Sequence, residues 1–277
     1  MAQDLYFSDE ELVAFRMAQV YENSLTTARI MSLLDDPSLV PGNYDFQHLQ
    51  DVHKFIFQDF PKAWLEQNEQ TAQFFDYLEP NVFQFEPGLL RSEKDAYNPT
   101  VKCREIQADN KTIGSNTHYS CMAEFDKEHA DQLLISMHPK TLQGLPENEV
   151  LGQLVDLYKE LDFIHPFEEG NSRTLRTMTQ LMAQEAGYEL CWSKVNQNEL
   201  YAARDLSLNE KAIHYYGEIS KTTGEQFEFI DEAISNLQNL KNHDFKPMAT
   251  VMLETEGLLQ HYGVPSQEAS NDSRLEF

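Results

Sequence analysis

The segment from His165 to Arg176, with the sequence HPFEEGNSRTLR, concentrates more kinds of reactive side chain than any other part of the chain. It contains an imidazole, a pair of carboxylates, a Gly-Asn turn and two arginines. A helical pattern of apolar residues precedes the segment and another follows it. Together, these groups suit the chemistry of a nucleoside triphosphate.

The second half of the segment has the features of a phosphate site. Gly170 and Asn171 can turn the chain sharply, since Gly tolerates positive φ and Asn nearly so. A helix then begins at Asn171 or Ser172, either of which is a good N-cap, and its first N–H groups favour an anion. Arg173 and Arg176 are three residues apart, so they share one helical face beside that anion site. Guanidinium groups suit phosphate because their donors are paired and fixed.

The other polar groups of the segment suit metal binding and proton transfer. Glu169 could hold a hard cation such as Mg²⁺, which binds few protein carboxylates together with phosphate oxygens. His165 could take a proton from an incoming hydroxyl group, and Phe167 would anchor the loop in the core. Each residue alone also has a structural interpretation: a packed histidine, a solvated arginine face, or an acidic turn at Glu168 and Glu169. All of these would have to hold within one short loop, so we favour the functional interpretation.

The order His-x-Phe-x-Glu-Gly-Asn-x-Arg-x-x-Arg resembles the signature of Fic-domain proteins. The resemblance implies a mainly helical fold and transfer of AMP from ATP to a hydroxyl group of a target protein. It also implies a role for each motif residue: general base His165, Mg²⁺ ligand Glu169, anion-hole residues Gly170 and Asn171, and triphosphate ligands Arg173 and Arg176. Ser172 is a departure, because many members have a second Gly there. Since Ser is small, we expect the loop to tolerate it and to bind phosphate.

A looser similarity runs from about Tyr44 to about Asn209. Residues 45–59 resemble the helix that opens the core of many Fic proteins, which is often followed by Tyr-x-Trp-Ala-Gly. This chain has Phe-Pro-Lys-Ala-Trp at 60–64 instead, so residues 61–102 are hard to align. Apart from the resemblance, His48 and His53 are interpreted as ordinary packing or surface residues.

Composition excludes some classes of partner. The 277 residues are 41% hydrophobic, which suffices for a globular core, and carry a net charge of −25. Such an acidic surface disfavours nucleic acid and anionic membranes as partners. The three cysteines are widely spaced, which argues against a disulfide framework. The sequence also shows neither the pattern of a signal peptide nor an apolar run long enough to span a membrane. We therefore expect a cytoplasmic protein with reduced thiols.

The apolar periodicity predicts a mainly all-α chain, and the resemblance implies that it forms a Fic-like helical bundle with a short β-hairpin flap. We expect one domain over residues 1–262, with its core at about 44–209 and flanking helices, and a disordered tail over 263–277. We expect a first helix that is capped by Ser8 and has an apolar stripe reaching Tyr21. Further helices are expected at about 46–57, 62–79, 125–138, 147–164, 171–187, 199–205, 210–220 and 226–240.

Residues Val101 to Tyr119 alternate enough to predict a hairpin, turning either at Asp109-Asn110 or at Gly114. Ile106 and Tyr119 would be its packed residues. In Fic proteins a hairpin flap in this place holds the target segment as an added strand. We assign residues 104–121 to that flap, with a plain structural hairpin as the alternative.

Many Fic proteins are restrained by a helix with a Ser/Thr-x-x-x-Glu-Gly/Asn motif, whose Glu pairs with the second motif arginine, here Arg176. Two segments match in part. Thr250 to Glu254 has the spacing but is followed by Thr255, whereas the segment ending in Glu22-Asn23 begins with Ala18. Inhibition by a separate small protein is the third alternative.

The sequence therefore predicts a protein adenylyltransferase that transfers AMP from Mg²⁺-bound ATP to a Ser, Thr or Tyr hydroxyl of a target protein, or of itself. His165 would deprotonate that hydroxyl, whose oxygen attacks the α-phosphate while pyrophosphate leaves. One alternative keeps the fold but transfers another nucleotide, a phosphoryl group or phosphocholine. The other is a non-enzymatic nucleotide-binding interaction protein. The presence of both arginines favours AMP.

Overall fold

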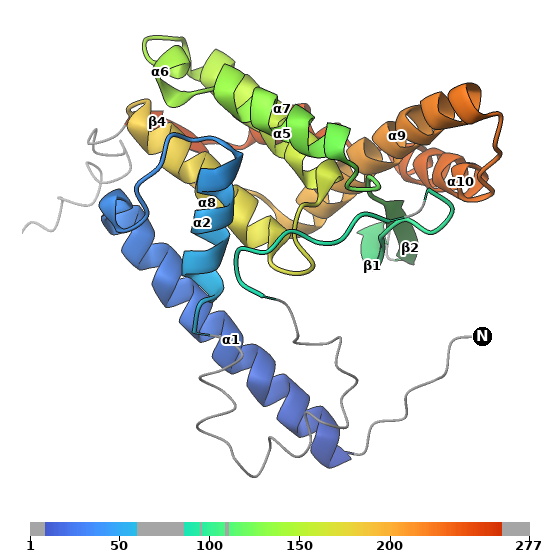
Figure 1. The fold of residues 1–277 in the computed structure, drawn as a ribbon, viewed down its shortest axis with the longest axis horizontal. Coiled ribbons are helices and arrows are strands. Elements are labelled where there is room, and N and C mark those ends of the chain that lie inside the picture. Colours follow the sequence, from blue (N-terminus) through green and yellow to red (C-terminus); the bar gives the residue numbers. More distant parts are fainter. Residues whose placement is uncertain (1–8, 60–85, 95, 109–110, 262–277) are drawn as a thin grey trace, which may run out of the picture. The chain divides into compact units, whose positions relative to one another are not determined.

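The computed structural model describes residues 9–59, 86–94, 96–108 and 111–261, and these are mainly helical (Figure 1). The helices are α1 (Asp9–Asp35), α2 (Phe46–Phe57), α5 (Glu124–Ser136), α6 (Pro139–Leu142), α7 (Glu147–Ile164), α8 (Asn171–Glu185), α9 (Gln197–Thr223), α10 (Phe229–Asn242) and α11 (Met248–Glu254), with 3-10 turns η1 (Pro37–Leu39) and η2 (Trp192–Lys194). The strands are β1 (Val101–Ala108), β2 (Lys111–His118), β3 (Tyr188–Leu190) and β4 (Leu259–His261). The mainly helical class with a hairpin is confirmed.

The chain divides into two compact units. One comprises Met1–Ser92 and Pro166–Met178, and the other Glu93–His165 and Thr179–Phe277. The reactive segment is therefore shared, because His165 ends a stretch of the second unit while the following residues belong to the first. The single domain over residues 1–262 stays a prediction. The expected helix at 62–79, the cap Ser8 and the tail at 263–277 lie outside the described residues.

In the first unit, α2 has the amphipathic character that its sequence predicts. The side chain of Asp45 caps its N-terminus by accepting a hydrogen bond from the His48 N–H at 2.8 Å. Five apolar side chains of one face are buried: Phe46, Leu49, Val52, Ile56 and Phe57. α1 lies beside α2 (Figure 1), and Arg29 of α1 forms an ion pair with Asp59, two residues after the end of α2. Val20, expected in the apolar stripe of α1, is instead 66% exposed.

In the second unit, α7 and α9 supply much of the core. α7 begins and ends at the predicted residues. The prediction of two short helices at 199–205 and 210–220 was wrong, because α9 continues through both. The residues between them contain neither Gly nor Pro, and Leu206, Leu208 and Asn209 are buried in the continuous helix. Asn196 caps its start and Gly224, at φ 75°, ends it.

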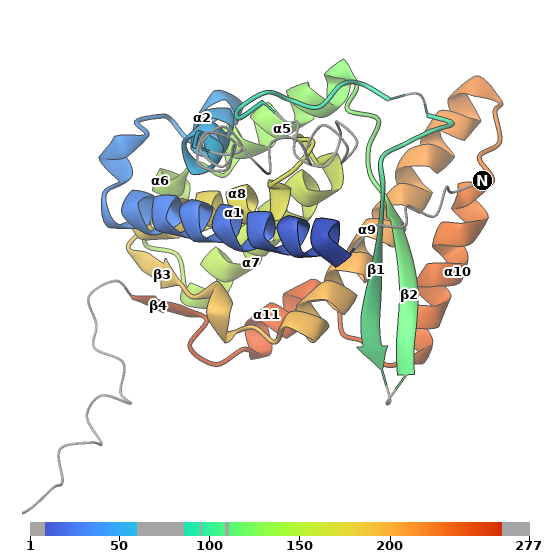
Figure 2. The same cartoon turned by 90° about the horizontal axis from the view of Figure 1, so that it is seen from below.

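The predicted hairpin is present as β1 and β2, which pair with Val101 opposite His118 and Ala108 opposite Lys111. Gly114 lies within β2 opposite Glu105, so the alternative turn at Gly114 was wrong. Residues 109–110, the other predicted turn, lie outside the described residues. The hairpin lies along α9 and α10 (Figure 2), and Ile106 is fully buried, as expected.

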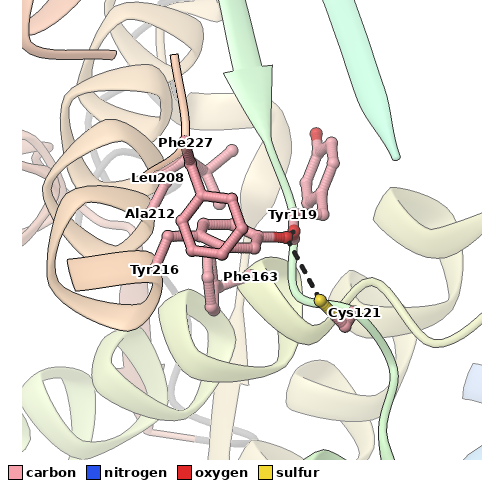
Figure 3. Close-up of a cluster of buried hydrophobic side chains, with 7 residues drawn as sticks. All are labelled: Tyr119, Cys121, Phe163, Leu208, Ala212, Tyr216 and Phe227. Atoms are coloured by element: carbon pink, nitrogen blue, oxygen red, sulfur yellow. Dashed lines mark hydrogen bonds between the residues drawn. The ribbon is translucent and has the colours of Figure 1, made fainter. Parts of the chain in front are cut away.

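A cluster of buried side chains joins the end of β2 to α7 and α9 (Figure 3). Its members are Tyr119, Cys121, Phe163, Leu208, Ala212, Tyr216 and Phe227. The Tyr216 hydroxyl donates a hydrogen bond to the Tyr119 carbonyl oxygen at 2.6 Å, and the Cys121 thiol lies 3.7 Å from that hydroxyl. Because these contacts fix residues 119–121, the chain that leaves β2 is held against the last turn of α7.

Several small features were not predicted, among them α6, a single turn that begins at Pro139 directly after the helix expected at 125–138. α11 follows α10, and the strands β3 and β4 pair antiparallel, with Leu190 opposite Leu259. Each strand has only three residues, too few for a clear alternating pattern. None of the helices in the described part of the chain has the length and apolar character needed to cross a membrane.

Candidate active site

The loop before α8 needs a glycine at residue 170 for two reasons. Gly170 has a φ of 78°, a conformation that other residues adopt only with strain. A Cβ atom there would lie 2.3 Å from Cζ of Phe57 and 3.2 Å from Nε2 of His53. The first backbone bond of the α8 ladder runs from Thr174 N–H to the Gly170 carbonyl at 3.0 Å, so α8 begins directly after this glycine. The N–H groups of its first turn therefore face the loop and suit an anion.

Asn171 closes the loop rather than capping the helix with its side chain. Its Oδ1 accepts from the Phe167 N–H at 2.9 Å, and its Nδ2 donates to the Phe167 carbonyl at 2.6 Å. The side chain is therefore committed to the backbone on the opposite side of the turn, and Asn171 is only 3% exposed. This residue therefore shapes the loop that leads into α8.

His53 holds the same loop from α2. Its Nε2 lies 3.0 Å from the Glu169 carbonyl oxygen, and its Nδ1 accepts a hydrogen bond from the Gly88 N–H at 2.8 Å. Because Nδ1 accepts, Nε2 must carry the proton and donate it to Glu169. The ring also stacks on Phe167, with centroids 3.9 Å apart and planes 13° apart. The interpretation of His53 as an ordinary packing residue was therefore incomplete, since it positions the loop.

Burial keeps His53 neutral. The imidazole is fully buried, and this lowers its pKa from the ordinary 6.5 to about 4, although the bond to the Glu169 carbonyl acts in the opposite direction. A protonated ring would carry hydrogens on both nitrogens and could no longer accept from Gly88. A signal for this role existed in the sequence: His53 follows Val52 on the buried face of a strongly amphipathic helix.

Arg173 is engaged by α1. Its Nη2 donates to Oε1 of Glu22 at 2.6 Å, and its Nη1 to Oγ1 of Thr26 at 3.1 Å and to Oδ1 of Asn23 at 3.3 Å. The guanidinium also lies over the ring of Phe57, with Cζ 4.7 Å from the ring centroid. The three partners on α1 share one helical face, and the Glu22 side chain is only 13% exposed. Arg173 thus has its donors directed at a carboxylate.

His165 caps the C-terminus of α7 in the second unit. Its φ of 51° and ψ of 61° place it in the left-handed region, and its N–H donates to the Leu161 carbonyl at 3.0 Å. A non-glycine residue pays a strain energy in that conformation, so its surroundings must hold it there. The imidazole is 5% exposed and lies against the Tyr119 ring, with centroids 3.9 Å apart.

A sequence model of the Fic/DOC family matches residues 43–183, which is just over half of the chain. The chain belongs to the Fic/DOC family. It is 34% identical over 166 residues to the protein adenylyltransferase VbhT of Bartonella schoenbuchensis, covering 59% of this chain and 26% of the relative. It is 25% identical over 241 residues to a protein adenylyltransferase of Bartonella henselae, covering 83% of this chain and 38% of the relative.

The chain thus spans about a quarter to two fifths of the length of these two Fic relatives. Among solved structures, it is similar to the N-terminal Fic domain, with bound ADP, of a putative cell filamentation protein from Bartonella quintana. The two are 17% identical with a TM-score of 0.48, and the match covers 86% of this chain and 89% of that one.

The Fic motif residues Glu169 to Arg176 meet at the start of α8 in the first unit. Nε of Arg176 donates to the Ser172 carbonyl at 3.1 Å. The Glu169 side chain is exposed, while its carbonyl is held by His53. No group of three or more metal-ligating side chains occurs among the described residues. A Mg²⁺ ion does not need one, because it binds one or two carboxylates together with phosphate oxygens and water, and the exposed Glu169 carboxylate fits that chemistry.

The structure distinguishes the two candidate inhibitory glutamates. Glu22 pairs with a motif arginine, but the partner is Arg173, whereas the inhibitory motif predicts Arg176. Thr26 and Asn23 give Arg173 two further acceptors on α1, which explains why this arginine is the one engaged. Glu254 instead forms an ion pair with Lys246 in the second unit, and both side chains are 56% exposed.

The neutral state of His53 should make stability depend on pH. Because its folded-state pKa lies below 6.5, the unfolded chain binds the proton more tightly, so stability is lost as the pH falls from 6.5 towards 4. Between pH 7 and pH 5 we expect the wild type to lose about 2 kcal/mol more of its free energy of unfolding than His53→Gln, measured by urea denaturation.

The matched control is His129→Gln, since the His129 side chain is 55% exposed. That variant should keep the wild-type pH dependence. Equal slopes for the wild type and His53→Gln would show that this histidine is not held neutral in the folded chain.

Proposed function

We propose that the chain is a protein adenylyltransferase, which transfers AMP from Mg²⁺-bound ATP to a Ser, Thr or Tyr hydroxyl of a target protein or of itself. The main support for the proposal is the loop at Gly170, which is held by the hydrogen bond between His53 and the Glu169 carbonyl. The loop leads into the first turn of α8, which contains Arg173. Helix N–H groups and a guanidinium together suit a polyphosphate. The names of the two curated relatives support transfer of an adenylyl group.

Each motif residue then has one task. The backbone of residues 170–172 binds phosphate oxygens, and Arg173 and Arg176 bind the outer phosphates. His165 accepts the proton of the target hydroxyl as its oxygen forms a bond to the α-phosphorus. The bond from that phosphorus to the pyrophosphate oxygen breaks, and pyrophosphate leaves with the bonding electrons. Mg²⁺, held by Glu169 and phosphate oxygens, would offset the negative charge of the leaving group.

The hairpin of β1 and β2 is the proposed flap for the target segment. One contact at the outer edge of β1 supports this assignment. The Gln107 N–H donates to Oδ1 of Asn198 at 2.8 Å, and the Gln107 carbonyl accepts from Nδ2 of Asn198 at 2.7 Å. A side-chain amide thus makes the two bonds that a neighbouring strand would make. This pattern supports main-chain recognition of an extended target segment.

Glu22 is the proposed inhibitor within the chain. Its carboxylate accepts a hydrogen bond from Nη2 of Arg173, and a donor held by a carboxylate cannot at the same time bind a phosphate oxygen of ATP. The contact with Glu22 favours inhibition by α1 over inhibition by a separate small protein. It also explains how an adenylyltransferase can be kept from modifying itself.

Transfer is tested by incubating the full chain with Mg²⁺ and α-labelled ATP and measuring intact mass. We expect the wild type to gain the mass of AMP and His165→Ala to be slower by roughly 10²–10⁴-fold, the usual effect of removing a positioned base. His214→Ala, which changes an exposed histidine of α9, should match the wild type. Because α1 restrains the wild type in this account, the same three chains are also compared with Glu22→Gly added.

The label separates the alternatives. A phosphate mass gain with label from γ-labelled ATP would identify phosphoryl transfer instead. ATP binding without any mass gain, with and without Glu22→Gly, would favour a non-enzymatic interaction protein. Equal rates for the wild type and His165→Ala would contradict the role of His165 as the base.

Removal of Glu22 should activate the chain. A charge-assisted hydrogen bond of this kind contributes about 1.5–3 kcal/mol, so Glu22→Gly should raise self-modification by roughly 10–100-fold. Glu254→Gly is the matched control, because it removes a glutamate whose ion pair with Lys246 is exposed. Equal activity of the wild type and both variants would remove in-chain inhibition by either glutamate and leave a separate inhibitor.

A further inference from the structure

We propose that Tyr119 is a positioning residue for His165, and that the buried ion pair of Arg204 and Asp162 holds Tyr119 in place. The inference rests on the proposed function, in which His165 accepts the proton of the target hydroxyl. Tyr119, His165, Arg204 and Asp162 all lie in the second unit.

The contact between the two rings is the first step. Tyr119 is fully buried directly after β2, and its ring centroid lies 3.9 Å from that of His165, with planes 31° apart. A ring packed at that distance restricts rotation of the imidazole about its side-chain bonds. A general base must meet its proton within hydrogen-bond reach, so a fixed ring plane contributes directly to its rate.

The Tyr119 hydroxyl supplies the second step. It accepts a hydrogen bond from Nη2 of Arg204 at 3.0 Å, and that same nitrogen donates to Oδ1 of Asp162 at 2.6 Å. Nε of Arg204 donates to Oδ2 of Asp162, so the pair is bidentate. Two parallel bonds fix the plane of a guanidinium, which here aims Nη2 at the tyrosine oxygen. Asp162 lies on α7 three residues before His165, so the network returns to the helix that carries the base.

The backbone supplies the third step. The Ser120 N–H donates to the Phe163 carbonyl at 3.1 Å, and its Oγ donates to the Ile164 carbonyl at 3.2 Å. These bonds tie the residue after Tyr119 to the two residues before His165. Residues 119 and 120 thus act together: Ser120 supports the left-handed backbone conformation of His165, and Tyr119 packs against the His165 ring.

A buried ion pair is weak support for stability, because desolvation of two charges offsets their attraction. Asp162 and Arg204 have side-chain exposures of only 1% and 7%. Their geometry instead favours a specific orienting role, in which the pair fixes a hydrogen-bond donor for Tyr119. The charges of Arg204 and Asp162 nearly cancel. The Arg204 guanidinium can therefore lie near the Tyr119 ring without strongly repelling a protonated His165.

The test compares three variants of the full chain in AMP transfer and in ATP binding. Tyr119→Leu removes the ring and should lower kcat about 10–100-fold, with the Kd for ATP unchanged within about twofold. Tyr119→Phe keeps the ring but loses the hydroxyl that accepts from Arg204, so it should lower kcat about tenfold, less than Tyr119→Leu. Tyr188→Leu is the matched control, since Tyr188 is another buried tyrosine stacked on a histidine, His261, and should keep wild-type kcat.

The role of the ion pair is tested by combining Asp162→Leu with Arg204→Met, so that neither charge of the pair is left buried without its partner. We expect it to lower kcat about tenfold without changing the Kd for ATP. Equal losses of kcat in Tyr119→Leu and Tyr188→Leu would overturn the proposal, because both would then reflect general loss of packing. A Tyr119→Phe variant as impaired as Tyr119→Leu would overturn the role of the ring.

A nuclear magnetic resonance readout separates this proposal from the proposed function. The His165 Cε1–H signal, assigned by its loss in His165→Ala, should shift in Tyr119→Leu and stay in place in Tyr188→Leu, because ring contact shields it. If the chain transfers no AMP, the proposed function fails while this measurement still tests the positioning contact. An unchanged His165 signal in Tyr119→Leu would overturn the contact itself.

Discussion

The hydrogen bonds of His53 are the constraint on which the candidate phosphate site depends. One imidazole joins the Gly88 N–H to the Glu169 carbonyl, and it can do so only in the neutral tautomer with the proton on Nε2. The loop must then pass so close to α2 that residue 170 can have no side chain. The start of α8, and with it the direction of its first N–H groups, follows from that approach. The burial of His53, its neutral tautomer and the glycine at residue 170 are therefore all needed to hold the loop before α8 in this position.

Arg173 is the residue that both phosphate binding and inhibition by Glu22 would use. Its guanidinium packs on Phe57, a residue of the same buried face of α2, so its position is set by the scaffold. Its donors can serve a phosphate group or Glu22 of α1. In the proposed function, a chain with a net charge of −25 repels ATP overall, so the local arginines must supply the attraction. Occupation of Arg173 by a carboxylate should then lower the affinity for ATP.

Local sequence patterns predicted the features that depend on neighbouring residues. The helix at 147–164, the glycine turn and the hairpin strands follow from periodicity and turn chemistry, and the Fic signature identified the family. Features that depend on distant contacts were missed or misjudged. Glu22 and Arg173 are 151 residues apart, and His53 and Glu169 are 116 apart, so no spacing rule could pair them. α9 was predicted as two helices, because its apolar period weakens at residues that tertiary packing buries.

If ATP and Glu22 compete for Arg173, a double-mutant cycle of ATP affinity will show coupling between the two residues. The Kd for ATP with Mg²⁺ is measured by calorimetry for the wild type, Glu22→Gln, Arg173→Gln and the double variant. We expect Glu22→Gln to tighten ATP binding about tenfold when Arg173 is present and to have no effect when residue 173 is Gln. An equal effect of Glu22→Gln in both backgrounds would contradict this competition, since the two residues would then act independently on ATP.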